Sequence, residues 1–336
     1  GYLSLAQNLR DRHEDTLNQL LDPGPDRESV LLKINKLLDE HVELCNAVCI
    51  LNEATPRIID AVVSFGERLS SRLVAAVLRG HGVQARAFEG GEFLRTDDTY
   101  QSALPDWDIT QRNVDARLLP LMNEGVTPVI TGFIGAAENG DTTTLGRGGS
   151  DYSAAIFAAM TRSHALTIWT DVDGVMTTDP RIDPRAEVLP YVSYQEVGEL
   201  AYYGAKVLHP KTVQPILDMG MTLRVRNTFN PDHPGTRIGP EMQASTTVIK
   251  AVTNVRSVSL LTVSGRGMLG VPGIAGRSFL ASARAGANIL MISQSSSEQS
   301  FCFTVTDERA LAVRDAVADE LRQEISPLDL AVCEMN

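Results

Sequence analysis

The sequence predicts two domains in tandem: a layered α/β domain with a mainly parallel sheet, and a smaller domain of ferredoxin-like βαββαβ order. Three observations support this fold class. A length of 336 residues suggests about two domains. Short β-rich runs alternate with helical stretches in the middle of the chain, as in α/β folds. Beyond a turn-rich stretch near residue 230, strand and helix patterns follow one another in the ferredoxin-like order.

The first 82 residues are expected to be helical, because apolar side chains recur there at three- and four-residue steps. Leu17, Leu20 and Leu21 form one such set, and the stretch Leu31–Leu38 contains another. The Asp-Pro-Gly-Pro segment at 22–25 separates the first two helices, since proline and glycine interrupt helical backbone.

From residue 83 on, β-rich runs alternate with helical patterns. Strands are expected at 83–88, 127–131, 166–170 and 222–225, and helices at 113–123, 151–160, 194–204 and 210–219. This alternation is typical of a mainly parallel sheet between helices. The turn-rich segment Asn230–Gly235 then begins a linker that runs to about Ser245. We therefore expect a first domain over residues 1–240 and a second over 246–336.

The second domain has six expected elements and a glycine-rich turn at 264–273. The elements are strand 258–263, helix 274–285, strands 288–293 and 300–305, helix 309–321 and strand 328–334. Their βαββαβ order is that of a ferredoxin-like domain.

Composition excludes several classes of protein. Apolar residues make up 43% of the chain and charged residues 21%, values typical of a globular protein. The net charge of −12 argues against a nucleic-acid binder. No apolar run approaches the ~18 residues that span a bilayer, so we expect no membrane segment.

The four cysteines include no CxxC pair and no histidine at metal-ligand spacing, so zinc is not expected. Residues 1–20 lack the apolar region of a secretory signal, and we therefore expect a cytoplasmic protein. Because the chain begins without Met and already in a helical pattern, we expect the natural N-terminus to lie upstream.

The segment Gly265–Gly270 matches G-x-G-x-x-G between a strand and a helix, a pattern of dinucleotide sites. Such a site needs an acidic residue about twenty positions on, but the segment Asn288–Ser297 has none. We interpret this segment instead as a turn that leads the chain into a helix. If the segment has a function, we expect it to bind a small ligand at the N-terminus of that helix.

The segment Thr142–Asp151 is a richer loop, TTTLGRGGSD, which runs directly into a helix. Its glycines let backbone N–H groups converge on an anion, the helix N-terminus adds partial positive charge, and Arg147 supplies a planar fork. It is not a Walker A loop, because no Gly-Lys-Ser/Thr follows. Asp151 beside such an anion would need a cation between them, which points to Mg²⁺ and a phosphate.

Two carboxylates, Asp171 and Asp173, follow the apolar run 166–169, so they lie just past the end of an expected strand. Ligands bind at that edge of open α/β sheets. Taken alone, this Asp/Thr/Gly run is also typical of an ordinary turn. Lys206 and Glu67 are likewise unremarkable alone, as an exposed lysine and a first-turn helix acid.

Six motifs in this order resemble an aspartokinase, which phosphorylates the side-chain carboxylate of L-aspartate with ATP. They are SFGERLSS, TGFIG, TTTLGRGGSDYSAA, TDVDGVMTTDPR, ELAYYGAKVLHPKT and GIAGRSF with ANILMISQSSSEQS. The resemblance covers roughly residues 30–336. It is greatest to the kinase portion of long aspartokinases, some of which are fused to homoserine dehydrogenase.

The resemblance implies an amino-acid-kinase domain followed by an ACT regulatory domain. It implies the reaction of ATP and Mg²⁺ with L-aspartate to give 4-phospho-L-aspartate, the first step towards lysine, threonine and methionine. Lysine, threonine or both would inhibit through the ACT domain. A homodimer or tetramer through ACT domains is the implied assembly, with no nucleic-acid or membrane partner.

The resemblance also implies roles for single residues, motif by motif. Aspartate would be held by Glu67, Phe133, Arg147, Gly148 and Ser150, and the nucleotide by Thr170, Asp171, Met176, Arg181 and Lys206. Arg147 and Asp151 would be catalytic, with Asp151 organising the magnesium-bound phosphate. The effector amino acid would contact Gly270, Val271, Pro272, Asn288, Ile289 and Gln294.

Three departures from the family pattern leave alternatives open. The family's opening strand with Lys-Phe-Gly-Gly-Thr-Ser is absent from this sequence, Met176 stands where a Tyr is usual, and an expected second ACT repeat does not follow. One rival hypothesis keeps the fold but takes glutamate, carbamate or a nucleoside monophosphate as acceptor. Another is a catalytically inactive amino-acid sensor.

Overall fold

The computed structural model describes residues 2–202, 208–243, 249–265, 268, 270–295, 299–322 and 330–335. It divides into two compact units, residues 1–253 and 254–336. None of the helices in the described ranges combines the length and hydrophobicity that a membrane span requires.

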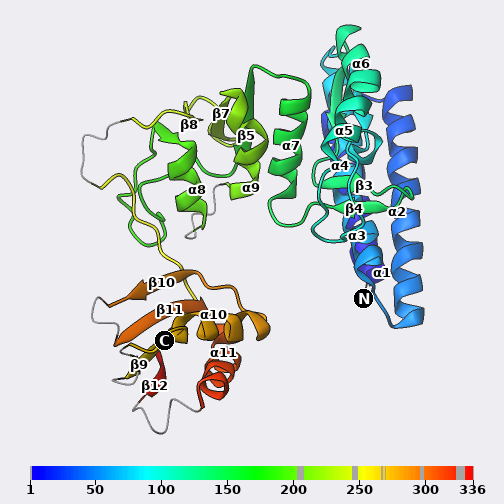
Figure 1. Cartoon of the computed structure of the whole chain (residues 1–336). Coiled ribbons are helices and arrows are strands. Elements are labelled where there is room, and N and C mark those ends of the chain that lie inside the picture. The colour runs from blue at the N-terminus through cyan, green and yellow to red at the C-terminus, as the bar shows by residue number, and fades with distance from the viewer. Residues whose placement is uncertain are drawn as a thin grey trace. The chain divides into compact units, whose positions relative to one another are not determined.

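The expected N-terminal helical region is confirmed and contains four helices. They are α1 (Tyr2–Leu20), α2 (Pro25–Leu51), α3 (Pro56–Val63) and α4 (Phe65–Gly80), drawn in blue to cyan in Figure 1. Pro25 opens α2, where its missing N–H costs nothing. Leu17 of α1, Leu38 of α2 and Leu69 of α4 are buried in one apolar cluster, which fastens these helices together.

The next part of the chain adds a short parallel pair, a helical segment and a hairpin. β1 (Ala85–Phe88) pairs in parallel with β2 (Thr127–Ile130), and between them lie η1 (Gly90–Glu92), α5 (Trp107–Asn113), the π-helical η2 (Val114–Leu118) and α6 (Leu119–Asn123). β3 (Ile134–Ala136) and β4 (Thr142–Thr144) form an antiparallel hairpin. The sequence did not predict this hairpin, because three-residue strands are too short to show an alternating pattern.

A second sheet has the order β5-β7-β8-β6. Its strands are β5 (Ala165–Thr170), β6 (Tyr191–Ser193), β7 (Thr222–Asn227) and β8 (Thr236–Gly239). The pair β5–β7 is parallel, whereas β7–β8 is antiparallel. Its buried face, with Ile168 and Leu223, packs in one core with α7 (Gly149–Met160), α8 (Tyr194–Tyr202), α9 (Pro210–Val213) and η3 (Gln214–Met219).

Strand β8 lies inside the stretch that the sequence predicted to be a linker, and that expectation was wrong. The proline-rich turn at 230–235 is a tight connection between antiparallel strands. Thr236 is fully buried, and its hydroxyl accepts from the Val175 N–H at 2.8 Å. Residues as far as Val252 stay with the first unit, since the Val252 N–H donates to the Thr177 carbonyl at 2.8 Å. The structural division thus falls after Thr253, whereas the predicted boundary lies at 240–246.

The second unit has the predicted βαββαβ order. It comprises β9 (Val258–Gly265), α10 (Ile274–Arg284), β10 (Met291–Gln294), β11 (Ser300–Thr306), α11 (Asp307–Glu320) and β12 (Leu330–Met335). The sheet is antiparallel, in the order β10-β11-β9-β12. Phe301 and Phe303 of β11 are buried with Val313 of α11 in its core. β10 begins three residues later than predicted, at Met291 rather than Asn288.

Candidate functional site

The start of α7 borders a cavity of about 500 Å³ in the first unit. It is lined by Ile59, Asp60, Val63, Gln101, Phe133, Thr144, Gly146, Arg147, Gly148, Gly149, Ser150 and Asp151. Five of the residues that the sequence singled out for aspartate and phosphate, Phe133, Arg147, Gly148, Ser150 and Asp151, therefore lie around one space.

The glycines of this loop are required by its backbone and its neighbours. Gly146 and Gly148 have φ angles of 76° and 72°, in the left-handed region that favours glycine. A Cβ at Gly148 would lie 2.4 Å from the Cβ of His209, and one at Gly149 would lie 2.6 Å from the Phe133 ring. The first residues of α7 line the cavity, and a helix N-terminus favours an anion.

Arg147 is exposed at this loop and makes no ion pair or hydrogen bond with the residues that the structure describes. Its guanidinium is therefore available to a ligand. Burial, followed by the charges of Lys211 and Arg147, lowers the pKa of His209, so this neighbour is neutral at pH 7. The sequence analysis did not single out His209.

Glu67 joins three segments of the site. One carboxylate oxygen accepts from the Gly132 N–H at 3.1 Å, and the other accepts from the Ser150 hydroxyl at 2.9 Å. The side chain comes from α4, Gly132 follows β2, and Ser150 is in the first turn of α7. Glu67 thus fixes the loop and the helix start relative to each other.

Phe133 has φ of 66°, a left-handed conformation that is rare outside glycine. It is held there from both sides: its N–H donates to the Ser153 hydroxyl at 3.1 Å, and its carbonyl accepts from the Leu145 N–H at 3.0 Å. Strained backbone of this kind persists only where the surroundings hold it, and it gathers at functional sites.

Asp60 is a site residue that the sequence analysis missed. It is fully buried and lines the cavity. Its carboxylate accepts from the Thr144 N–H at 2.9 Å, the Thr144 hydroxyl at 2.8 Å and the Gln101 N–H at 2.9 Å. It thereby fastens α3 to β4, two residues before Gly146. The only signal in the sequence was an acid inside the apolar run IIDAVV.

Asp151 is half-buried in the first turn of α7, and burial raises the pKa of its carboxyl group. A cation beside it would offset this effect. Among the described residues there is no cluster of three His, Cys, Asp or Glu that could hold a metal ion. Any magnesium here would therefore take most of its ligands from phosphate oxygens and water, as Mg²⁺ usually does.

Four of the predicted nucleotide residues, Thr170, Asp171, Met176 and Arg181, do not line this cavity. Thr170 ends β5, and its hydroxyl donates to Asp171 at 3.2 Å. Met176 bridges Val188 in an isolated antiparallel pair. Arg181 forms an ion pair with Asp179 at 2.6 Å, so a phosphate would have to compete for its guanidinium. Lys206 lies outside the described residues.

Asp173, which follows the same strand, is held from a neighbouring turn. It accepts from Asn227 at 2.8 Å and from Asn230 at 3.1 Å. The Asn227 hydrogen bond, more than any other contact, lowers the pKa of Asp173. This carboxylate therefore ties the carboxyl end of β5 to the turn after β7.

The predicted effector residues fall into two groups in the second unit. Gly270, Val271 and Pro272 precede α10, near the end of β9. Gln294 lies at that same end of the sheet, because it is in register with Phe301 and, through it, with Val263. Asn288 and Ile289 precede β10 and lie toward the opposite end.

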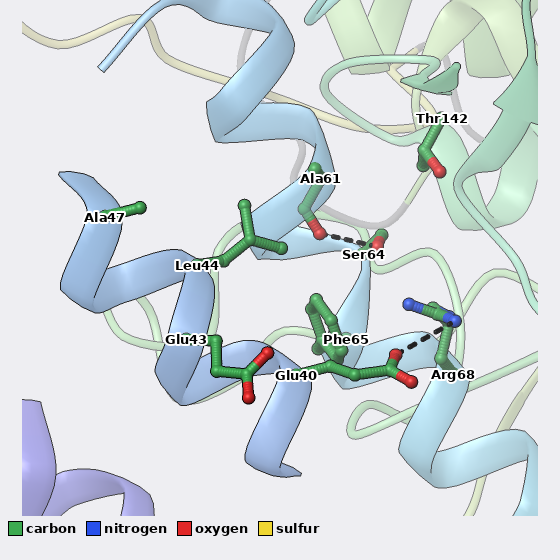
Figure 2. Close-up of a pocket in the computed structure, with 9 residues that line it drawn as sticks. All are labelled: Glu40, Glu43, Leu44, Ala47, Ala61, Ser64, Phe65, Arg68 and Thr142. Atoms are coloured by element: carbon green, nitrogen blue, oxygen red, sulfur yellow. Dashed lines mark hydrogen bonds and ion pairs between the residues drawn. The ribbon is translucent and has the colours of Figure 1, made fainter. Parts of the chain in front are cut away.

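A separate cavity of about 510 Å³ contains none of the predicted site residues. Figure 2 shows it between α2, the junction of α3 with α4, and Thr142 of β4. Here Arg68 lies between two acids, at 2.9 Å from Glu89 and 3.9 Å from Glu40. It also covers the Phe65 ring, 4.8 Å from its centroid. We therefore take the cavity at α7 as the candidate functional site.

Comparison with known proteins identifies the family. The model of the amino acid kinase family matches residues 5–227, and an ACT domain model matches residues 261–321. The first match covers more than half of the chain. The chain therefore belongs to the amino acid kinase family and also carries an ACT domain.

Similar proteins with solved structures show to which group within this family the chain belongs. The chain matches E. coli aspartokinase III in complex with aspartate and ADP, in the R-state, with a TM-score of 0.78 and 31% identity, over 99% of this chain and 73% of that one. The same enzyme in complex with lysine and aspartate, in the T-state, matches with a TM-score of 0.71 and 32% identity. The chain belongs to the aspartokinases.

Curated relatives include longer proteins. Bifunctional aspartokinase/homoserine dehydrogenase 1 of Arabidopsis thaliana is 37% identical over 97% of this chain, and aspartokinase 1 of the same plant is 34% identical over 97%. The chain spans 36% of the first and 56% of the second. Both names describe chloroplastic proteins.

Proposed function

We propose that the protein containing this chain transfers the γ-phosphoryl group of ATP to the β-carboxylate of L-aspartate. One observation carries the proposal: the uncommitted Arg147 guanidinium stands beside a glycine loop at a helix N-terminus, in one cavity with Asp151. Arg147 would hold the α-carboxylate of aspartate by two parallel hydrogen bonds. The aspartate and ADP bound to E. coli aspartokinase III support this choice of substrates.

The reaction needs little chemistry from the protein. A carboxylate oxygen of aspartate attacks the γ-phosphorus, a new O–P bond forms, and the bond to the bridging oxygen breaks as ADP leaves. Because the carboxylate is already ionised, no general base is required, and catalysis consists of positioning and charge neutralisation. Glu67 and Asp60 would act as positioning residues, since they fix the Arg147 loop from two sides.

Magnesium would supply neutralisation of the phosphate charge. Asp151 suits a bound magnesium ion, because it is a half-buried carboxylate beside the anion loop. Burial raises its pKa, and a neighbouring cation would lower the pKa again. The nucleotide would bind near the carboxyl end of β5, in a site lined by Thr170, Asp171, Met176, Arg181 and Lys206.

Two alternatives make different predictions. A kinase of the same fold that acts on glutamate, carbamate or a nucleoside monophosphate would release ADP with one of those acceptors instead. An inactive amino-acid sensor would release none with any of them. The test is ADP release by the protein at its full encoded length, with L-aspartate and each rival acceptor supplied separately. The proposal fails if L-aspartate is not the preferred acceptor.

Asp151→Asn provides a second test with two readouts. Turnover should fall about 100-fold, because a charge that organises the metal-bound phosphate is lost, and saturating L-aspartate should not restore it. The melting temperature should rise, since burial raises the pKa of Asp151 and its ionised form therefore lowers stability at neutral pH. Normal turnover across a Mg²⁺ titration would remove Asp151 from the metal site.

Regulation is proposed to occur through the second unit. The lysine in the T-state complex of E. coli aspartokinase III supports an amino-acid effector. The effector would be lysine or threonine, bound between paired ACT domains. The turn Gly270–Pro272 would receive its carboxylate and Gln294 its polar groups. Gln294→Ala should shift the inhibition curve for lysine or threonine about tenfold, with unchanged uninhibited turnover. Unmoved curves for both amino acids would show that Gln294 is outside the effector site.

A further inference from the structure

The turn after β7 presents an aromatic side chain at the edge of the sheet where the nucleotide is proposed to bind. Phe229 is 83% exposed, more than any other large apolar side chain among the described residues. Its turn begins at Asn227, which is in register with Thr170 at the carboxyl end of β5. Isolated exposed apolar residues are common on proteins, so exposure alone assigns no role.

The backbone that carries Phe229 is firmly held. The Thr228 N–H donates to the Thr170 carbonyl at 2.8 Å, and the Phe229 N–H donates to the Asn227 side chain at 2.9 Å. Asn227 and Asn230, on either side, both donate to Asp173. The ring is therefore exposed on a turn that is bonded directly to the proposed nucleotide segment.

Two other side chains that the structure describes near this edge, Trp169 and Met176, are less suited to stacking. Trp169 is 50% exposed, but the Arg226 guanidinium covers its ring at 4.9 Å from the centroid. Arg226 also donates to the Pro231 and His233 carbonyls, so it stays beneath the turn. Met176, which the sequence analysis assigned to the nucleotide site, has no aromatic ring. Among the aromatic side chains described at this edge, Phe229 is the more exposed, at 83% against 50% for Trp169.

We propose that Phe229 is the platform on which the base of the nucleotide stacks. The inference rests on the proposed function, because it takes a nucleoside triphosphate as the phosphoryl donor. Stacking on an aromatic ring tolerates any base, since every base has a π face. Phe229 therefore contributes to nucleotide affinity without distinguishing ATP from GTP.

The test compares two probes that share phosphates but differ in the base. Binding of ADP and of inorganic tripolyphosphate is measured by calorimetry on the full-length protein and on Phe229→Ala. ADP should bind about tenfold more weakly to the variant. Tripolyphosphate, which has no base, should bind both proteins equally. GDP should lose affinity by the same factor as ADP.

Two variants control the comparison. Phe229→Trp retains an aromatic face and should keep ADP affinity within about twofold of the unsubstituted protein. Trp107→Ala removes an aromatic side chain of 42% exposure on α5, outside the proposed site, and should leave both probes unaffected.

The outcomes separate this inference from the proposed function. Equal ADP affinity of Phe229→Ala and the unsubstituted protein would overturn the stacking role alone. So would an equal loss of ADP and tripolyphosphate, because the effect would then lie in the phosphate site or the fold. Failure of the unsubstituted protein to bind ADP would overturn the proposed function and, with it, the role of Phe229.

Discussion

The two cavities of the first unit have nearly equal volumes, about 500 and 510 Å³, and each is lined by an arginine. Arg68 is paired with Glu89 and lies near Glu40, so its charge is neutralised within the protein. Arg147 makes no such contact with any described residue. The difference shows that an arginine in a cavity indicates an anion site only where the protein leaves its charge uncompensated.

The sharpest test of this comparison exchanges each arginine for alanine. Arg147→Ala should lower kcat/KM for L-aspartate, because a bidentate charge-assisted contact is lost. The decrease should correspond to a loss of about 2–4 kcal/mol of transition-state stabilisation. The KM for ATP should change less than about twofold. Steady-state kinetics with each substrate varied in turn provide the measurement. Arg68→Ala is the matched control and should keep the KM for L-aspartate. Equal effects of the two variants would end the distinction between the cavities.

A smaller effect on L-aspartate binding is expected at Glu67. Its carboxylate accepts from Ser150, three residues after Arg147, and so supports the Arg147 loop. In the variant Glu67→Ala, the Gly132 N–H and the Ser150 hydroxyl both lose their acceptor on this side chain. The KM for L-aspartate should rise about fivefold to tenfold, or about 1–1.5 kcal/mol. Turnover at saturation should change less than KM. A change in turnover alone would argue that Glu67 acts on the reaction and not on the loop.

The smallest effect is expected at Glu89, the ion-pair partner of Arg68, and it concerns stability. Glu89→Gln removes the carboxylate that accepts from Arg68 at 2.9 Å and Arg72 at 2.8 Å. The free energy of unfolding at pH 7 should fall by about 1 kcal/mol, since the pair is partly exposed. L-aspartate kinetics should not change. Urea unfolding monitored by circular dichroism provides the measurement.

The stability difference between Glu89→Gln and the unsubstituted protein should depend on pH. Burial alone would raise the pKa of Glu89, but hydrogen bonds and charges from Arg72 and Arg68 outweigh it and hold the pKa below its usual value. The stabilisation is therefore complete above the unfolded-state pKa of about 4.3 and is lost as the pH falls through the lower folded value. The two proteins should become equally stable at low pH. A difference that persists there would assign it to packing.

Much of the fold could be predicted from local pattern. The long helices and the buried strands show periodic apolar residues, and β9 to β12 with their helices follow the predicted order. The hairpin β3–β4 and strand β8 were missed, because each has only three or four residues. β8 also follows a turn rich in proline and glycine, which the sequence alone cannot distinguish from a linker.

The gathering of candidate residues around one cavity was predictable to the extent that they share one loop. Arg147, Gly148, Ser150 and Asp151 are consecutive or nearly so, and the glycine-rich sequence before a helix gives their chemistry. Asp60 could not be found in this way, because its partner Thr144 is 84 residues away. The ion pair of Arg181 with Asp179 likewise depends on a turn conformation that the residue types do not determine.

The same long separations have a consequence for the order of folding. The bonds that close the cavity at α7 join Asp60 to Thr144 and Glu67 to Ser150, across 84 and 83 residues of chain. The helices α1, α2 and α4 need only contacts within the first 80 residues. Because closing long loops is slow compared with forming local helices, we expect the helical layer to collapse first. The cavity at α7 is then among the last features of the first unit to form, and a chain released from the ribosome before residue 150 would carry the helices without it.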